Sequence, residues 1–215
     1  MVGHDIRNPL QSILGDVYLT KMDLASLPDS EAKEGLQESL EAIEKQTEYI
    51  NKIVLDLQDF AKPLNPHDEE TDIELIINEL LVRNGVPKNI QTDAKVEADA
   101  KKMMADSAYM KRIIGNLVSN AVQAMPNGGK LTLRAYREAS DIVITVEDTG
   151  VGIPEEAEPK LFQPLFTTKS KGQGFGLSVV KRLTEALNGT ITFESQEGKG
   201  TKFALRFPSP AKKNR

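Results

Sequence analysis

A chain of 215 residues with 39% hydrophobic residues is long and apolar enough for one or two packed domains. The formal net charge of −5 argues against a nucleic-acid-binding protein, and the absence of cysteine excludes a disulfide framework and thiol chemistry. No apolar run approaches the roughly 20 residues of a membrane-spanning helix, and the first residues are unlike a signal peptide. We therefore expect a cytoplasmic protein with no membrane segment in this chain; attachment to a membrane through a preceding N-terminal region is the alternative.

The N-terminal part of the chain carries two amphipathic repeats. Residues 4–27 and 31–62 each have apolar side chains at alternating spacings of four and three, which predicts two helices with heptad seams. Pro28 ends the first helix, and the short connection predicts an antiparallel hairpin. Since one hairpin cannot bury both seams, we expect two copies to form a dimeric four-helix bundle; a coiled-coil dimer without chemistry is the alternative.

His4 heads this hairpin and lies outside its seam, so we expect its ring to face water. Asp5 is adjacent, and Asn8 lies one helical turn further along the same face. Pro9 lacks an N–H group, so the helix can bend there. A single exposed histidine is most often an ordinary surface residue, and its meaning depends on the rest of the chain.

A change in composition at residues 63–66 predicts a domain boundary. Pro63, Asn65 and Pro66 are typical of a linker. We therefore assign residues 1–64 to the hairpin, 65–208 to a second domain and 209–215 to a disordered basic tail.

The second domain mixes helical and strand patterns, which predicts an α+β chain whose second part is an α/β sandwich with a mixed sheet. Helical spacing covers 72–84, a segment from a cap at Asp106 to Met125, and a segment that ends at Gly189. Alternation predicts strands over 130–136, 142–147, 191–194 and 202–207. Residues 89–104 are ambiguous, with short strands expected near Ile90, Val96 and Met103–Met104.

Asn116 and Asn120 stand four residues apart on the predicted helix 106–125, so they share one face. Asparagine is a poor interior helix former, and two beside apolar neighbours indicate a polar role. The functional interpretation is an oxygen ligand for Mg²⁺; a pair of satisfied structural amides is the alternative.

Three sequence boxes, two of them bearing glycines, follow between residues 148 and 177. The first is Asp-Thr-Gly-Val-Gly, the second Leu-Phe-Gln-Pro-Leu-Phe-Thr-Thr-Lys and the third Gly-Gln-Gly-Phe-Gly-Leu. Asp148 ends an apolar strand and can accept a hydrogen bond from a ligand amino group. The third box precedes a helix, whose first N–H groups can bind phosphate. Phe162 and Phe166 either pin the base of a lid over 162–171 or belong to the core.

Taken together, the order and spacing of these boxes resemble the N, G1, F and G2 boxes of the ATP-binding domain of sensor histidine kinases, over about residues 70–208. The run His4-Asp-Ile-Arg-Asn-Pro-Leu10 looks like their H box, so the resemblance covers nearly the whole chain. The stretch Gln-Ala-Met-Pro-Asn-Gly-Gly from residue 123 is most similar to soluble members such as nitrogen-regulation kinases.

This resemblance implies a protein-histidine kinase that uses ATP and Mg²⁺ and transfers a phosphoryl group from ATP to His4, and then to a response-regulator receiver domain. It implies Asp5 as proton acceptor, Asn8 as the residue that orients water in a phosphatase reaction, Asp148 on the adenine amino group, Asn120 on Mg²⁺ and Lys169 near the γ-phosphate. The remaining nucleotide-binding residues expected from the boxes are Asn116, Gly150, Gly152, Phe166, Gly172, Gly174, Gly176 and Leu177.

Some features differ from the family pattern or keep other functions open. Gln123 replaces a basic residue of many kinases, and only three residues precede His4, so we expect the chain to be part of a longer protein. Related ATPases such as gyrase have a glutamate where Asn116 stands, which favours phosphoryl transfer over hydrolysis. An ATPase of the same nucleotide-binding fold and a non-catalytic dimeric docking module remain the alternatives.

Overall fold

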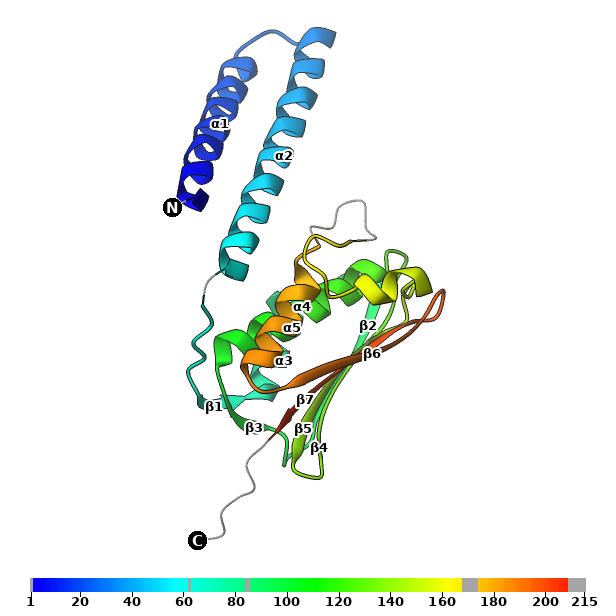
Figure 1. Cartoon of the computed structure of the whole chain (residues 1–215). Coiled ribbons are helices and arrows are strands. Elements are labelled where there is room, and N and C mark those ends of the chain that lie inside the picture. Colours follow the sequence, from blue (N-terminus) through cyan, green and yellow to red (C-terminus); the bar gives the residue numbers. More distant parts are fainter. Residues whose placement is uncertain (1, 62, 84–85, 168–173, 209–215) are drawn as a thin grey trace. The chain divides into compact units, whose positions relative to one another are not determined.

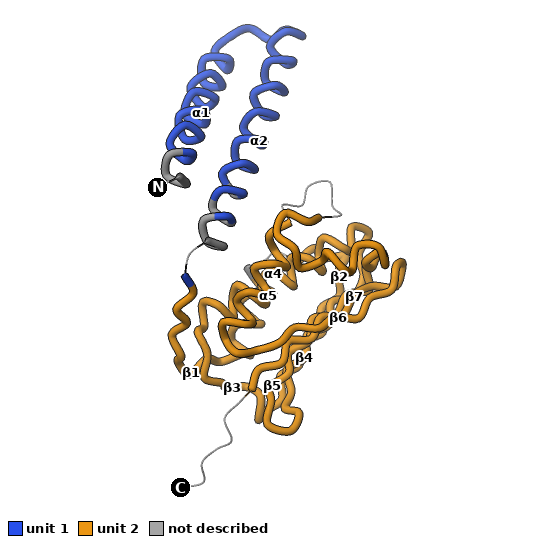
Figure 2. The backbone as a smooth tube through the Cα atoms, in the orientation of Figure 1, with its two compact units in different colours: residues 1–63 blue, residues 64–215 orange. Residues whose placement is uncertain are grey.

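The computed structural model describes residues 2–61, 63–83, 86–167 and 174–208, without the side chains of residues 2–5, of Arg83 and of several residues near the end of the second helix. The chain divides into two compact units, residues 1–63 and 64–215 (Figure 2).

Unit 1 is an antiparallel pair of helices, α1 (Val2–Ala25) and α2 (Glu31–Ala61) (Figure 1). The helix α1 begins before Pro9 and continues through it, so the expected helical hairpin is confirmed. Lys21 Nζ and Glu44 Oε2 form an ion pair 2.5 Å long between the two helices.

Two stripes of mostly apolar residues with seven-residue spacing run along the helices of unit 1. The inner stripe is buried in the described hairpin and comprises Leu10, Val17, Leu24, Thr47 and Val54. The outer stripe is 38% to 54% exposed and comprises Ile6, Ile13, Leu27, Leu36, Ile43, Ile50 and Leu57. A single hairpin therefore covers one stripe of each helix and leaves the other open to solvent.

Unit 2 contains a mixed five-stranded sheet of order β2-β4-β5-β7-β6, in which β2 and β4 are parallel and the other neighbours antiparallel. Its strands are β2 (Ile90–Val96), β4 (Gly129–Glu138), β5 (Asp141–Asp148), β6 (Thr190–Gln196) and β7 (Gly200–Pro208). The expected mixed-sheet α/β domain is thus confirmed.

Three helices accompany this sheet: α3 (Ile73–Arg83), α4 (Ser107–Ala124) and α5 (Gly176–Ala186) (Figure 1). The core between them includes Ile113, Leu117, Leu133 and Ile144, none more than 1% exposed. Asp106 caps α4 as predicted, since its Oδ1 accepts the N–H of Tyr109 at 3.0 Å.

Two elements were not predicted from the sequence. Strand β1 (Glu69–Asp72) pairs antiparallel with β3 (Lys102–Ala105), and a 3-10 helix covers Glu155–Lys160. The segment Glu-Glu-Thr-Asp has no apolar alternation, so only its pairing with β3 makes it a strand. The helix predicted from residue 72 begins at Ile73, because Asp72 Oδ1 accepts the Leu75 N–H at 3.0 Å and acts as its cap.

Candidate functional site

Asp148 occupies the last position of β5, as the end of the apolar run predicts, and is only 6% exposed. Its Oδ1 accepts the N–H of Gly150 at 2.9 Å. The carboxylate thus shapes the loop that follows it, residues 148–153, which we call the G1 loop.

Both glycines of the G1 loop are required by packing against other backbone segments. A Cβ on Gly150 would lie 2.4 Å from the Ala124 carbonyl oxygen, and the Val151 N–H donates to that same oxygen at 3.0 Å. Gly152 has φ +71°, and its Cβ would lie 2.2 Å from the Gln196 carbonyl oxygen. The close approach therefore comes from the C-terminal end of α4 and the end of β6, so these glycines do not need a ligand to explain them.

The two asparagines of α4, Asn116 and Asn120, are both half-buried. Asn120 lies beside the start of α5: its Nδ2 and Oδ1 would be 3.7 and 4.0 Å from a Cβ on Gly176. Helix α5 has no side-chain cap at its N-terminus, so its first backbone N–H groups are suited to an anion. The structure thus brings together Asn120 and the glycine box that the sequence predicted as separate parts of one site.

The base of the predicted lid is held by aromatic and glycine contacts. Phe162 lies edge-on to Phe193 of β6 at 5.9 Å between centroids, and Lys181 Nζ lies 5.8 Å from the Phe162 ring centre. Gly174 has φ +70°, and a Cβ there would lie 2.4 Å from the Leu165 carbonyl carbon. Gly174 therefore contacts the segment that carries Phe166, a half-buried side chain. Lys169 and Gly172 lie outside the described residues.

In unit 1, the backbones of His4 and Asp5 belong to α1, and their side chains lie outside the description. Asn8 is exposed on the following turn, where the helical spacing predicts it.

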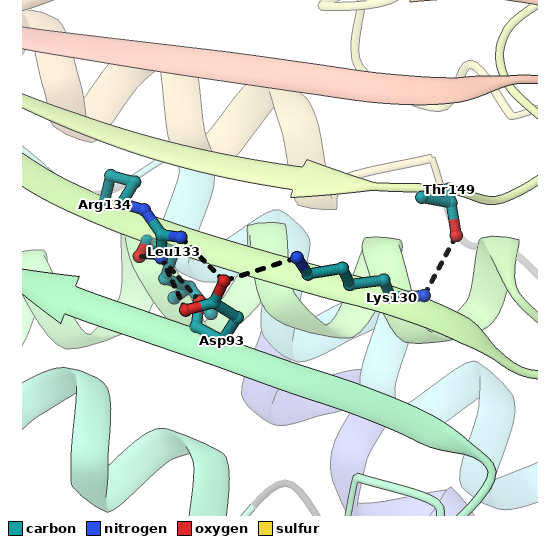
Figure 3. Close-up of polar contacts among 5 residues, drawn as sticks. All are labelled: Asp93, Lys130, Leu133, Arg134 and Thr149. Carbon is teal, nitrogen blue, oxygen red and sulfur yellow. Dashed lines mark hydrogen bonds and ion pairs between the residues drawn. The ribbon is translucent and has the colours of Figure 1, made fainter.

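A cluster of charges at the edge of the sheet does not belong to the site. Arg134 Nη2 lies 2.7 Å from Asp93 Oδ2, and Lys130 Nζ lies 3.3 Å from the same oxygen (Figure 3). The Arg134 guanidinium, chiefly by hydrogen bonding, holds the pKa of the Asp93 carboxyl below its ordinary value, with a smaller contribution from Lys130. These pairs tie the edge strand β2 to β4, while the backbone N–H of Lys130 donates to Thr149 Oγ1 of the G1 loop at 2.9 Å.

The described part of the chain contains no group of three or more His, Asp and Glu side chains able to hold a metal ion. Among the described helices, none has the length and apolar content to cross a membrane.

Two family matches cover most of the chain. Residues 1–66 match the His Kinase A (phospho-acceptor) domain, and residues 105–211 match the family described as histidine kinase-, DNA gyrase B- and HSP90-like ATPase. The second match contains Asn116, Asn120 and Asp148, and the first contains His4.

Curated proteins similar to this chain are longer than it is. The signal transduction histidine-protein kinase AtoS of Escherichia coli (strain K12) is 30% identical, over 96% of this chain and 34% of its own length. The sensor histidine kinase ZraS of the same organism is 32% identical, over 96% of this chain and 44% of its own length. The chain thus spans less than half of these relatives.

Solved structures agree on the fold. Full-length ShkA in complex with AMPPNP matches with a TM-score of 0.77 at 23% identity, over 98% of this chain and 45% of that one. The histidine kinase ThkA in complex with the response regulator protein TrrA matches with a TM-score of 0.70 at 26% identity, over 99% of this chain and 61% of that one.

Proposed function

The chain belongs to the histidine kinase family and joins its phospho-acceptor domain to its ATP-binding domain, and on this premise we propose that it is the catalytic core of a sensor histidine kinase. The γ-phosphoryl group of ATP is transferred to a ring nitrogen of His4 and then to an aspartate of a response-regulator receiver domain in the cytoplasm. The observation that carries the proposal is the meeting of Asn120 with the uncapped start of α5, in a unit whose G1 loop begins at the buried Asp148.

Each group in unit 2 has a role that suits its chemistry. The Asp148 carboxylate accepts a hydrogen bond from the adenine amino group, while its Oδ1 also keeps the G1 loop folded. The N–H groups at the start of α5, beside Gly176, bind the phosphates. The half-buried Phe166, beside Gly174, helps to cover the bound nucleotide.

The donor set fits Mg²⁺, a hard ion that takes most of its oxygen ligands from phosphates and water. The described residues offer no carboxylate cluster, and the amide oxygen of Asn120 is the protein ligand we assign. When bound, the ion neutralises charge on the phosphates during transfer. Asn116 lacks the acid–base capacity of a carboxylate, which supports transfer to the protein over activation of water.

In unit 1, we assign Asp5 the role of accepting the proton that His4 releases as the phosphoryl group arrives. Asn8, exposed one turn later, orients a water molecule that hydrolyses the aspartyl phosphate of the receiver domain. The open outer stripe supports a homodimer in which two hairpins form a four-helix bundle.

Incubation with γ-labelled ATP and Mg²⁺ tests the function. We expect acid-labile label on the wild-type protein and none on His4→Gln, whose amide cannot form the phosphoramidate. Release of free phosphate without protein label would instead indicate an ATPase of the same fold. Neither product would indicate a docking module, and both of these outcomes contradict the proposal.

A further inference from the structure

The turn between β6 and β7, residues 195–201, contacts the second half of the G1 loop. Ser195 Oγ accepts the backbone N–H of Ile153 at 2.9 Å. The Gly198 N–H donates to the Val151 carbonyl oxygen at 2.8 Å. The β6–β7 turn therefore holds the part of the loop that lies furthest along the chain from Asp148.

Backbone meets backbone closely at two points of this contact. Gly200 has φ +120°, and a Cβ there would lie 2.0 Å from the Asp148 carbonyl oxygen. At Gly152, a Cβ would lie 2.2 Å from the Gln196 carbonyl oxygen. No other residue fits at either glycine without moving the loop.

The first half of the G1 loop is held by hydrogen bonds to other elements of unit 2. The Thr149 N–H donates to the Lys130 carbonyl oxygen at 3.2 Å, and the Val151 N–H donates to the Ala124 carbonyl oxygen at 3.0 Å. Those partners are backbone atoms, whereas Ser195 contributes a side chain, and its hydroxyl also lies 2.9 Å from Thr201 Oγ1. Ser195 is thus a point where one substitution can loosen the loop.

We propose that Ser195 is a positioning residue for nucleotide binding: by holding the Ile153 N–H, it keeps the G1 loop in the shape that aims Asp148 at the base. The inference rests on the proposed function, because it takes Asp148 as the adenine-binding group. A loop ordered in advance loses less conformational freedom when the ligand binds, so affinity depends on Ser195 without direct contact between its side chain and the ligand.

The test measures ADP affinity by calorimetry and amide exchange of residues 150–153 in the nucleotide-free protein. Ser195→Ala leaves the half-buried Ile153 N–H without its acceptor, and we expect ADP binding to weaken about tenfold and exchange to accelerate about tenfold. Ser195→Thr keeps the hydroxyl and restores both values. Thr192→Ala, on an exposed position of the same strand, changes neither.

Unchanged ADP affinity in Ser195→Ala, or an equal loss in Thr192→Ala, overturns the inference. If Ser195→Ala does not fold, Ser195→Cys replaces it, because a thiol is close to the hydroxyl in shape but accepts hydrogen bonds weakly; wild-type affinity in that variant overturns the inference too. If the wild-type protein binds no ADP, the proposed function fails, while amide exchange still decides whether Ser195 orders the loop.

Discussion

The two units bury the same residue type to very different degrees. Ile13, Ile43 and Ile50 of the hairpin are 41% to 46% exposed, whereas Ile113, Ile114 and Ile144 of unit 2 are fully buried. Unit 2 completes its own core between a sheet and three helices, but each helix of the hairpin covers only one of two stripes. The difference supports our proposal that a second copy covers the outer stripe of the hairpin, whereas the core of unit 2 is complete within one chain.

The largest expected effect is on the dimer. Ile50→Asp places a charge in the outer stripe, where a second hairpin would bury it, so we expect the dimer to weaken by roughly a thousandfold. Light scattering at micromolar concentration measures this. Ala42→Asp adds the same charge at an exposed position outside both stripes and should leave the dimer intact. If the wild-type protein is a monomer, a second hairpin does not cover the outer stripe and the proposed dimer is wrong.

Nucleotide binding should depend on unit 2 alone. Asp148→Asn keeps an oxygen for the Gly150 N–H but presents an amide donor to the adenine amino group, so we expect affinity to fall about a hundredfold with the fold and dimer preserved. Calorimetry with ADP measures the loss. Wild-type affinity in this variant would remove Asp148 from the adenine site.

The hairpin should hold two separable activities. Asp5→Asn removes a proton acceptor, and we expect autophosphorylation to slow by about a hundredfold. Asn8→Ala should spare autophosphorylation and slow dephosphorylation of a cognate receiver domain. Both rates are measured with labelled protein; equal loss of both in Asn8→Ala would give that residue a purely structural role.

Stability of unit 2 should respond to its helix caps. Asp106 accepts the Tyr109 N–H at 3.0 Å with Oδ1 and the His67 N–H at 3.0 Å with Oδ2. Asp106→Ala loses both bonds, and we expect a loss of about 1 to 2 kcal/mol in the free energy of unfolding. Asp106→Ser, which keeps a capping oxygen, should recover part of it. Denaturant titration that shows no loss in Asp106→Ala would contradict the capping role.

The smallest effect should come from the exposed edge of the sheet. Because Arg134 lowers the pKa of Asp93 in the folded state, this carboxylate stabilises the fold above its ordinary pKa of about 4 and loses that contribution as the pH falls through the lower, folded value. Asp93→Asn should therefore lower the melting temperature slightly at pH 7 and have no effect in strong acid. If Asp93→Asn lowers the melting temperature by the same amount at pH 7 and in strong acid, the ion pair with Arg134 does not explain the loss.

Much of the fold could be predicted because its signals are local. Heptad spacing predicted both helices of the hairpin, and Asp106 with its capping side chain predicted the start of α4. Alternation predicted four strands of the sheet, and the spacing of the boxes indicated Asp148, Asn120 and Gly176 as members of one site. The roles of the site residues stay predictions.

The sequence by itself determined most of the elements and indicated the family, since helix periodicity, caps and glycine boxes are properties of neighbouring residues. Only the tertiary structure decided which of the two stripes faces inward, because that choice depends on how α1 rotates against α2. It also decided that Glu69–Asp72 forms a strand and that Ser195 holds the G1 loop. Those contacts join segments far apart in the chain, which come together only when the domain folds.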